Sequence, residues 1–181
     1  MTNSTDPKKI LLVGLDNSGK TSIVMSLKGI KTLPKFFNVK PSKGEDIQPI
    51  KVLDSEFSIW DLGGQESYRI EYLKNFNKYI KGCSKLIYVF DIQDTKRYDL
   101  ALEYFENLIN LVENNFNTNT IEISIFLHKN DPDLNVIKPE LTREIIDDLK
   151  EKIKNRIEKT SFFYQIFKTT IYALFEKNIT V

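Results

Sequence analysis

The chain has 181 residues, of which 41% are hydrophobic and 28% charged, and this length and composition predict one globular domain with a sizeable core. Its 26 Lys and Arg residues are balanced by 25 Asp and Glu and interspersed with them, which argues against generic nucleic-acid binding. The single cysteine, Cys83, excludes an internal disulfide and, with one histidine in the chain, a zinc site, so we expect a reducing cytosol.

Apolar runs of strand length alternate with stretches of helical spacing, which is typical of an α/β fold. Residues 9–15 (KILLVGL) form a continuous apolar run, as expected for a buried parallel strand, and residues 20–28 are predicted to be a helix. Residues 46–53 and 56–61 are predicted to pair as an antiparallel hairpin, with Pro49 favouring an edge position for the first of them.

Residues 85–91 and 122–129 are predicted to be two further buried strands, with a helix over about residues 95–116 between them. The apolar stripe of that helix is Ala101, Phe105, Leu108 and Val112. Pro139 is expected to open another helix, and residues 161–169 to form a sixth strand. The residues of the Pro139 helix expected to face inward are Ile145, Ile146, Leu149, Ile153 and Ile157. The pattern predicts a six-stranded, mostly parallel sheet with one antiparallel edge strand, flanked by helices.

The most informative stretch is GLDNSGKT, residues 14–21, which matches the phosphate-loop pattern G-x-x-x-x-G-K-[ST] between a predicted strand and a predicted helix. Its glycines let backbone N–H groups and the positive end of the helix point at phosphates. Lys20 is expected to reach the β and γ phosphates, and the Thr21 hydroxyl to bind Mg²⁺. The candidate nucleotide-binding residues here are Gly14, Asp16, Asn17, Ser18, Gly19, Lys20, Thr21 and Ser22. The alternative is a glycine-containing turn in a Rossmann-like sheet.

A second motif, WDLGGQE at residues 60–66, follows the third predicted strand. Asp61 is placed to hold Mg²⁺ through a water molecule, as Walker-B acids do, and Gly64 to offer its N–H to the γ phosphate. Gln65 stands where a carboxamide can orient the attacking water, which makes it the candidate catalytic residue. The alternative is a loop whose glycines only form a turn.

A third motif, HKND at residues 128–131, stands at the C-terminal end of a predicted strand, where open α/β sheets bind ligands. Asp131 can accept hydrogen bonds from N1–H and the exocyclic amine of guanine, a pair that adenine does not offer, and the stem of Lys129 can cover the ring. His128 is expected to be structural, bracing the phosphate loop or the ribose side, with no acid–base role.

These three motifs, in this order and over most of the chain, resemble the Ras-like small GTPase superfamily. GLDxxGKT and WDLGGQ are similar to the Arf and Arf-like family, whereas the histidine of HKxD and the segment KTTIY, residues 168–172, resemble the Rag family. Because archaeal relatives mix these features, both branches stay open. The resemblance implies a P-loop NTPase three-layer fold, a single GTPase domain over residues 1–181 with residues 1–7 flexible, and GTP or GDP with Mg²⁺ as cofactors. It also implies that Thr170 and Ile171 approach the guanine.

The first switch departs from the family pattern. Counting back from Asp61 places Ser42 where Arf-like proteins have a threonine that closes over Mg²⁺, and Thr32 is the alternative. The expected metal ligands are therefore Thr21, Ser42 and, through water, Asp61. Asp16 resembles the Arf phosphate loop, and because its carboxylate would repel the γ phosphate, we expect slow hydrolysis that a partner stimulates.

The N-terminal stretch MTNSTDPKKI resembles neither a signal peptide nor the amphipathic, myristoylated helix of Arf proteins, so we expect no intrinsic membrane anchor. The expected location is cytoplasmic, with peripheral attachment to a membrane through partners as an option. After residue 172 the stretch ALFEKNITV is too short for a full last helix, so we expect either an abbreviated helix or a chain that is a fragment. Effectors, exchange factors and GTPase-activating proteins are the expected partners, and a homo- or heterodimer stays open.

The surface that partners would read comprises Phe36, Phe37, Tyr68, Ile70, Tyr72 and Leu73, unless these side chains pack in the core. The predicted function is a guanine-nucleotide switch that hydrolyses GTP. Two alternatives remain, a scaffold that binds GTP or GDP without hydrolysis and, with less support because no arginine-rich clamp is present, a P-loop phosphotransferase.

Overall fold

A computed structural model of the chain describes residues 7–29, 39–40, 42–52, 55–116 and 120–171. Its centre is a six-stranded sheet in the order β2-β3-β1-β4-β5-β6. The strands are β1 (Lys8–Val13), β2 (Glu45–Val52), β3 (Ser55–Leu62), β4 (Cys83–Asp91), β5 (Glu122–His128) and β6 (Tyr164–Lys168). Edge strand β2 runs antiparallel to β3 and the other described neighbours pair in parallel, which confirms the predicted fold class.

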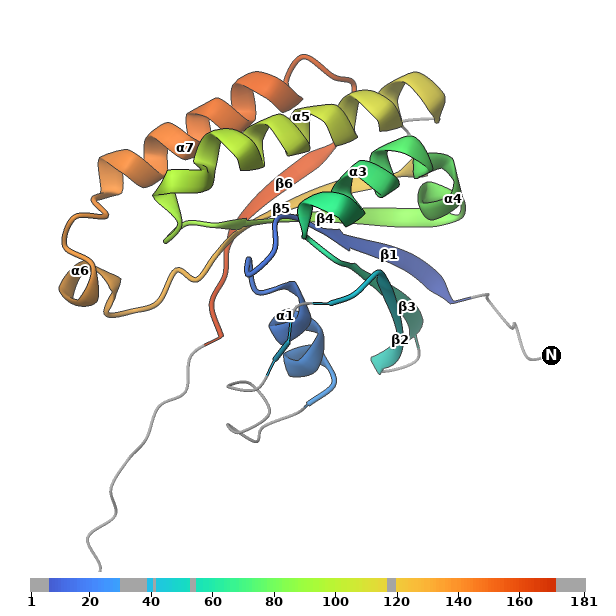
Figure 1. Cartoon of the computed structure of the whole chain (residues 1–181), viewed down its shortest axis with the longest axis horizontal. Helices are drawn as coiled ribbons and strands as arrows, with labels where there is room; N and C mark the ends of the chain where they lie inside the picture. Colours follow the sequence, from blue (N-terminus) through green and yellow to red (C-terminus); the bar gives the residue numbers. More distant parts are fainter. Residues whose placement is uncertain (1–6, 30–38, 41, 53–54, 117–119, 172–181) are drawn as a thin grey trace, which may run out of the picture.

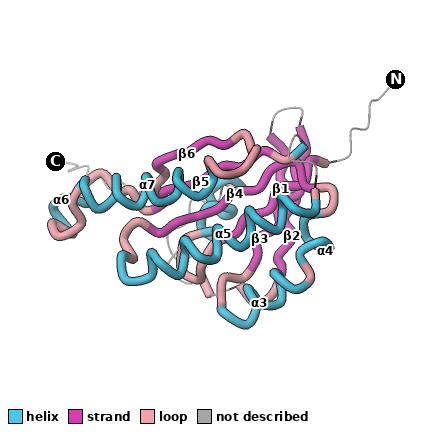
Figure 2. Tube along the Cα trace, turned by 90° about the horizontal axis from the view of Figure 1, so that it is seen from above, coloured by secondary structure: helices cyan, strands magenta, loops and turns pink. Residues whose placement is uncertain are grey.

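Helices cover both faces of this sheet, as Figure 1 shows. The helical elements are α1 (Lys20–Leu27), α3 (Glu66–Lys74), α4 (Phe76–Ile80), the 3-10 turn η1 (Thr95–Arg97), α5 (Tyr98–Asn115), α6 (Leu134–Ile137) and α7 (Arg143–Ile157). Helices α3, α5 and α7 lie on one face, where α5 and α7 run side by side (Figure 2), and α1 lies on the other. The result is the three-layer arrangement expected for this alternation of strands and helices. None of the helices within the described residues has the length and apolarity needed to cross a bilayer.

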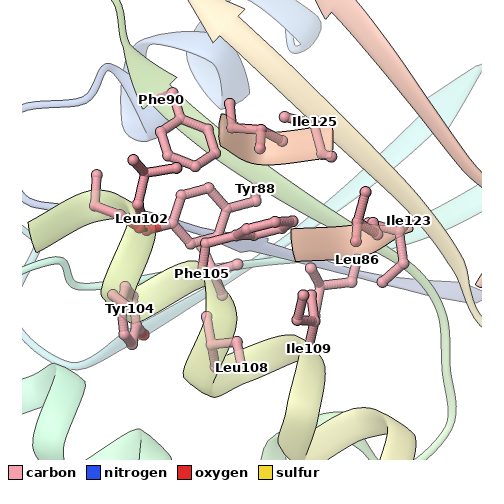
Figure 3. Close-up of a cluster of buried hydrophobic side chains, with 14 of the residues drawn as sticks. Leu86, Tyr88, Phe90, Leu102, Tyr104, Phe105, Leu108, Ile109, Ile123 and Ile125 are labelled. Carbon is pink, nitrogen blue, oxygen red and sulfur yellow. Dashed lines mark hydrogen bonds between the residues drawn. The ribbon is translucent and has the colours of Figure 1, made fainter. Parts of the chain in front are cut away.

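The larger core lies between the sheet and α5, and Figure 3 shows its centre. Phe105 is fully buried, and its ring lies 5.0 Å from that of Tyr88 and 5.6 Å from that of Phe90. The Tyr88 hydroxyl donates to the carbonyl of Ala101 at 2.7 Å, so this buried polar group is satisfied. All of the predicted α5 stripe is buried, namely Ala101, Phe105, Leu108 and Val112. Helical spacing therefore identified the packed face of α5 correctly.

The start predicted for the next helix was wrong. Helix α7 begins at Arg143 and not at Pro139, which lies in a turn closed by a hydrogen bond from Leu141 N to Lys138 O. The fixed φ of proline suits the second position of such a turn as well as the first turn of a helix. Ile145 was also expected to face inward and is 36% exposed. It lies beside the stripe, whose buried members are Ile146, Leu149, Ile153 and Ile157.

Helices α3 and α4 had not been predicted, and they resolve part of the question about the partner surface. Tyr72 is buried, and its ring packs edge-on against that of Tyr79 at 4.9 Å. Ile70 is 46% exposed, and Tyr68 and Leu73 are partly buried against the core. Phe36 and Phe37 lie outside the described residues. Of the residues expected to be read by partners, Ile70 offers the largest exposed apolar side chain within the described part of the chain.

Candidate functional site

The phosphate-loop motif joins β1 to α1 at the C-terminal edge of the sheet. Gly14 has φ 148° and Gly19 has φ 94°, both in the region that favours glycine, so the two motif glycines permit this loop conformation. The loop borders a cavity of about 430 Å³. Its lining residues are Asp16, Asn17, Ser18, Gly19, Lys20, Thr21, Ser22, Val39, Lys40, Ser42 and Gly64. Every residue predicted from the first motif except Gly14 therefore lines one cavity, and Gly64 of the second motif joins them.

Lys20 lies inside the phosphate loop with only 5% of its surface exposed. Its ammonium donates to the carbonyls of Leu15 at 2.7 Å and Gly14 at 3.0 Å. Burial lowers the pKa of Lys20 to about 8, against the opposing effects of the Asp61 and Asp16 carboxylates. The lysine is therefore a buried cation held by backbone carbonyls at the wall of the cavity.

Thr21, Ser42 and Asp61, from three separate segments, converge on one point. The Thr21 hydroxyl donates to Asp61 Oδ2 at 2.5 Å and lies 2.9 Å from the Ser42 hydroxyl, which itself donates to Asp61 Oδ2 at 3.1 Å. Burial raises the pKa of Asp61, while the bond from Thr21 and the charge of Lys20 oppose the rise. The other carboxylate oxygen, Oδ1, is buried without a hydrogen-bond partner within the described part of the chain.

This oxygen cluster fits a hard divalent cation. Two hydroxyls and a carboxylate are donors that Mg²⁺ prefers, and a bound cation would satisfy the orphaned oxygen of Asp61. Ser42 belongs to this cluster, whereas the alternative ligand Thr32 lies outside the described residues.

The second motif is seated on the phosphate loop. The carbonyl of Gly64 accepts from the backbone N–H of Asp16 at 3.0 Å, and a Cβ at position 64 would lie 2.1 Å from that nitrogen. Gly63 N donates to the carbonyl of Gly44 at 3.0 Å and to the Tyr72 hydroxyl at 3.1 Å. Only glycine at position 64 permits this close approach of the second motif to the phosphate loop. Gln65 follows at the start of α3, but its exposed side chain is not part of the cavity lining.

The third motif meets the end of β6, the segment that the resemblance implied would approach the guanine. Thr170 donates its hydroxyl to Asp131 Oδ1, and Gln93 donates its side-chain amide to Asp131 Oδ2 at 2.9 Å and to the carbonyl of Lys129 at 2.8 Å. The Lys129 ammonium pairs with Asp91 at 2.6 Å. Sequence reasoning missed Gln93, although its place just after β4, at the ligand-binding edge of the sheet, was an available signal.

His128 joins the third motif to the first. It is 3% exposed, its Nδ1 lies 3.0 Å from the Thr169 hydroxyl, and a Cβ built on Gly19 would lie 2.5 Å from its ring. Burial lowers the pKa of His128, the nearby charge of Lys129 lowers it further, and Asp91 acts in the opposite direction. The ring is therefore a neutral spacer against the phosphate loop. Ile171 is partly buried against the smaller core beneath α1.

Asp16 has a partner that sequence reasoning missed. Arg97 Nη1 lies 2.9 Å from Asp16 Oδ1, and its Nη2 donates to the backbone carbonyl of Asp16 at 3.1 Å. Arg97 Nε also pairs with Asp94 at 2.5 Å. The carboxylate that was expected to repel the γ phosphate is thus paired with a cation at the start of α5.

The chain matches the sequence model of the ADP-ribosylation factor family over residues 1–173. It is 33% identical over 143 residues to ADP-ribosylation factor-like protein 3 of Caenorhabditis elegans, an alignment covering 78% of this chain and 71% of that protein. It is 37% identical over 101 residues to ADP-ribosylation factor-like protein 2 of Arabidopsis thaliana, covering 56% of this chain and 50% of that protein. With ADP-ribosylation factor-like protein 5 of C. elegans, the 34% identity covers 52% of that protein. The matches thus span about half the length of most of these relatives.

Solved structures agree on the fold. The Arl6 BBS3 small GTPase from Trypanosoma brucei, with the bound nucleotide analogue GppNp, superposes with a TM-score of 0.63 at 16% identity and covers 91% of this chain and 87% of its own. The bacterial selenocysteine-specific elongation factor EF-Sec gives a TM-score of 0.61 at 20% identity over 92% of this chain and 26% of its own. Two solved structures of different size therefore share the fold of this chain.

Proposed function

This chain belongs to the ADP-ribosylation factor family, and we propose that it is a switch that binds GTP or GDP with Mg²⁺ and hydrolyses GTP slowly. The family match decides between the two branches that the motifs left open, in favour of the Arf and Arf-like branch. The Rag-like histidine of HKND is then a feature of this chain within an Arf-like framework.

One observation carries this proposal. The Thr21 and Ser42 hydroxyls and the Asp61 carboxylate meet within hydrogen-bonding distance beside the phosphate loop, and Asp61 keeps an orphaned buried oxygen. Mg²⁺ bound there would neutralise phosphate charge during transfer. Because Ser42 comes from the segment before β2, a cation and phosphate that bind it would strengthen its attachment to this point, and such a nucleotide-dependent attachment would be the basis of a switch.

Different residues would bind the phosphates and the guanine. Lys20 and the backbone of the phosphate loop would hold the β and γ phosphates, with Asn17, Ser18 and Ser22 completing the wall. At the other end, Asp131 would accept two hydrogen bonds from guanine. Gln93 and Thr170 hold its carboxylate from either side, which restricts its orientation.

Hydrolysis would rest on Gln65, whose carboxamide would orient the attacking water after the exposed side chain turns toward the phosphates. Gly64 would offer its N–H to the γ phosphate from its seat on the phosphate loop. With an exposed glutamine and no strong base assigned to the water, turnover without a partner would be slow.

Partners would recognise the surface formed by α3 and the segment before β2, where Ile70 is exposed. Effectors, exchange factors and GTPase-activating proteins are the classes we propose, acting in the cytoplasm or at a membrane to which a partner recruits the chain. Loss of the γ phosphate would remove its contacts to Ser42 and Gly64, loosen both segments and so change the surface that partners read.

The first experiment identifies the nucleotide. Protein purified without added nucleotide is denatured, and the released compounds are separated by chromatography, with GDP or GTP as the expected result. Adenine nucleotides in their place would refute the guanine assignment. The second experiment compares GTP hydrolysis by wild type and Gln65→Leu, with Ser67→Ala as a control at an exposed position in the first turn of α3. We expect Gln65→Leu alone to lose hydrolysis, whereas equal and negligible rates in all three would favour a non-hydrolysing scaffold.

A further inference from the structure

Arg97 holds Asp16 by two kinds of contact. One guanidinium nitrogen pairs with the Asp16 carboxylate at 2.9 Å, and a second donates to the Asp16 backbone carbonyl at 3.1 Å. The Arg97 Nε is occupied by Asp94 at 2.5 Å, which fixes the guanidinium plane. A planar fork bonded on three sides, and 31% exposed, is oriented far better than a single surface ion pair.

Asp16 is the residue through which this contact reaches the nucleotide cavity. It lines the main cavity together with Lys20 and Gly64, and its N–H donates to the Gly64 carbonyl. Arg97 does not line that cavity. It borders instead a gap of about 10 Å³ between the phosphate loop and α5, so that it acts on the cavity through Asp16.

The negative charge of Asp16 is the reason that its ion pair with Arg97 matters. A carboxylate at the wall of a cavity repels phosphates bound there. It repels a triphosphate more strongly than a diphosphate, because a triphosphate has one more phosphate group. A guanidinium bonded to that carboxylate offsets its charge and draws it toward α5. Resting on the function proposed above, we propose that Arg97 is a positioning residue that neutralises and restrains Asp16. Its effect would be to raise the affinity of the cavity for GTP relative to its affinity for GDP.

The test measures the affinities of wild type and Arg97→Ala for GDP and for a non-hydrolysable GTP analogue by fluorescent-nucleotide competition with Mg²⁺ present. We expect Arg97→Ala to weaken binding of the GTP analogue about fivefold to tenfold more than binding of GDP. Asp16→Asn in the Arg97→Ala background should restore the wild-type ratio of the two affinities, because the charge that Arg97 offsets is then absent. A general loss of structure would not produce this rescue.

Arg156→Ala is the matched control. Arg156 also pairs a guanidinium with a carboxylate, Glu106 at 3.1 Å, and its side chain is 28% exposed, but the pair links α7 to α5 away from the cavity. Its removal should leave the ratio unchanged. If Arg97→Ala fails to fold, Arg97→Gln, which keeps hydrogen-bond donors but no charge, is measured in its place.

The role of Arg97 would be overturned if Arg97→Ala left the ratio of the GTP-analogue and GDP affinities unchanged, whether or not both affinities fell. It would also be overturned if Asp16→Asn failed to restore that ratio. These outcomes differ from failure of the proposed function, in which the wild-type protein itself binds neither guanine nucleotide.

Discussion

At the scale of one residue, Lys20 shows how the phosphate loop holds a buried positive charge. Its ammonium is buried, and backbone carbonyls at 2.7 and 3.0 Å hold it in the loop. Replacing it by methionine, which keeps most of the side-chain volume, removes the charge that phosphates would meet. Since hydrogen bonds to charged groups contribute about 1.5 to 3 kcal/mol, we expect Lys20→Met to weaken GDP binding about 10- to 100-fold.

Isothermal titration calorimetry of the nucleotide-free protein measures this change. Lys28→Met is the control, because Lys28 lies at the exposed C-terminal end of the same helix, where its ammonium bonds Gln48 at 2.6 Å. A similar loss of affinity in both variants would mean that overall charge and not the position of Lys20 matters.

Gly64 illustrates a steric requirement. A Cβ there would lie 2.1 Å from the nitrogen of Asp16 and 2.2 Å from the carbonyl carbon of Leu15, both of them backbone atoms. Alanine would therefore push the WDLGGQE loop off the phosphate loop and break the bond between Asp16 N and Gly64 O. We expect Gly64→Ala to bind GDP normally and to lose hydrolysis about tenfold or more, because the donor to the γ phosphate is displaced. Single-turnover hydrolysis with radiolabelled GTP checks this, and unchanged hydrolysis would show that the loop does not need its seat.

The three motifs were readable from the sequence because each is contiguous, so that spacing alone reveals it. Gln93 and Arg97 were not, since they meet Asp131 and Asp16 across 38 and 81 residues of the chain. Contacts of this kind follow from the strand order of the sheet, which brings the ends of β1, β4 and β5 to one edge. Motifs thus identify the groups expected to touch the ligand, whereas the residues that orient those groups emerge only from the fold.

At the scale of elements, α5 buries the most residues of any helix in the described part of the chain. Phe105 is fully buried between Tyr88 and Phe90, with ring centroids at 5.0 and 5.6 Å. Phe105→Ala would leave a cavity that the rigid sheet cannot fill, and we expect a loss of about 3 to 5 kcal/mol in the free energy of unfolding. Leu100→Ala, at a 40% exposed position of the same helix, should lower it by about 0.5 kcal/mol or less.

Urea denaturation followed by circular dichroism measures both variants in parallel. Equal losses would contradict the importance of Phe105 packing, because alanine is the best helix former and helix propensity cannot account for a loss at either position.

The elements that sequence reasoning located well have a strong period, and those that it missed do not. Helix α5 buries seven residues of one face, whereas α3 buries only Arg69 and Tyr72. Strands within the parallel part of the sheet are buried on both sides and so appear as continuous apolar runs. A short helix held mainly by one tyrosine and by its attachment to Gly63 leaves no such pattern. The predicted start of α7 was wrong for another reason, because Pro139 fits a turn and a helix start equally well.

At the scale of the whole molecule, His128 links the end of β5, the phosphate loop and the end of β6. Burial lowers its pKa below the ordinary value of 6.5 in the folded chain, so the unfolded chain takes up its proton first as the pH falls. The stabilising effect of the neutral ring is complete above pH 6.5 and is lost as the pH falls toward the folded pKa. Between about pH 7.5 and about pH 5.5, wild type should therefore lose more stability than His128→Asn, which does not titrate there.

Denaturant midpoints at the two pH values give this difference directly. The charged and titratable neighbours of His128, namely Lys129, Asp91 and Asp131, remain in both proteins and so cancel in the comparison. Parallel pH profiles for the two proteins would contradict the neutral, bracing role of the histidine.

The same convergence makes the whole molecule sensitive to its ligand. Segments after β1, β3, β5 and β6 and the segment before β2 all contribute proposed contacts, so a bound nucleotide would connect parts that unfolding separates. Because a ligand that binds only the folded chain stabilises it by about 2.7 kcal/mol at 100 times its Kd, we expect GDP with Mg²⁺ to raise Tm by about 5 to 10 °C. Chelation of Mg²⁺ by EDTA should reverse most of this rise. Without the cation, the negative charge of Asp61, which Thr21 and Ser42 contact, would face the negative charge of the phosphates.

Differential scanning fluorimetry of nucleotide-free protein with EDTA is the control. It should show no change in Tm, because the magnesium effect acts through the nucleotide. A rise in Tm with GDP that EDTA leaves intact would show that GDP binding does not depend on Mg²⁺ and would contradict the assignment of the oxygen cluster as the metal site.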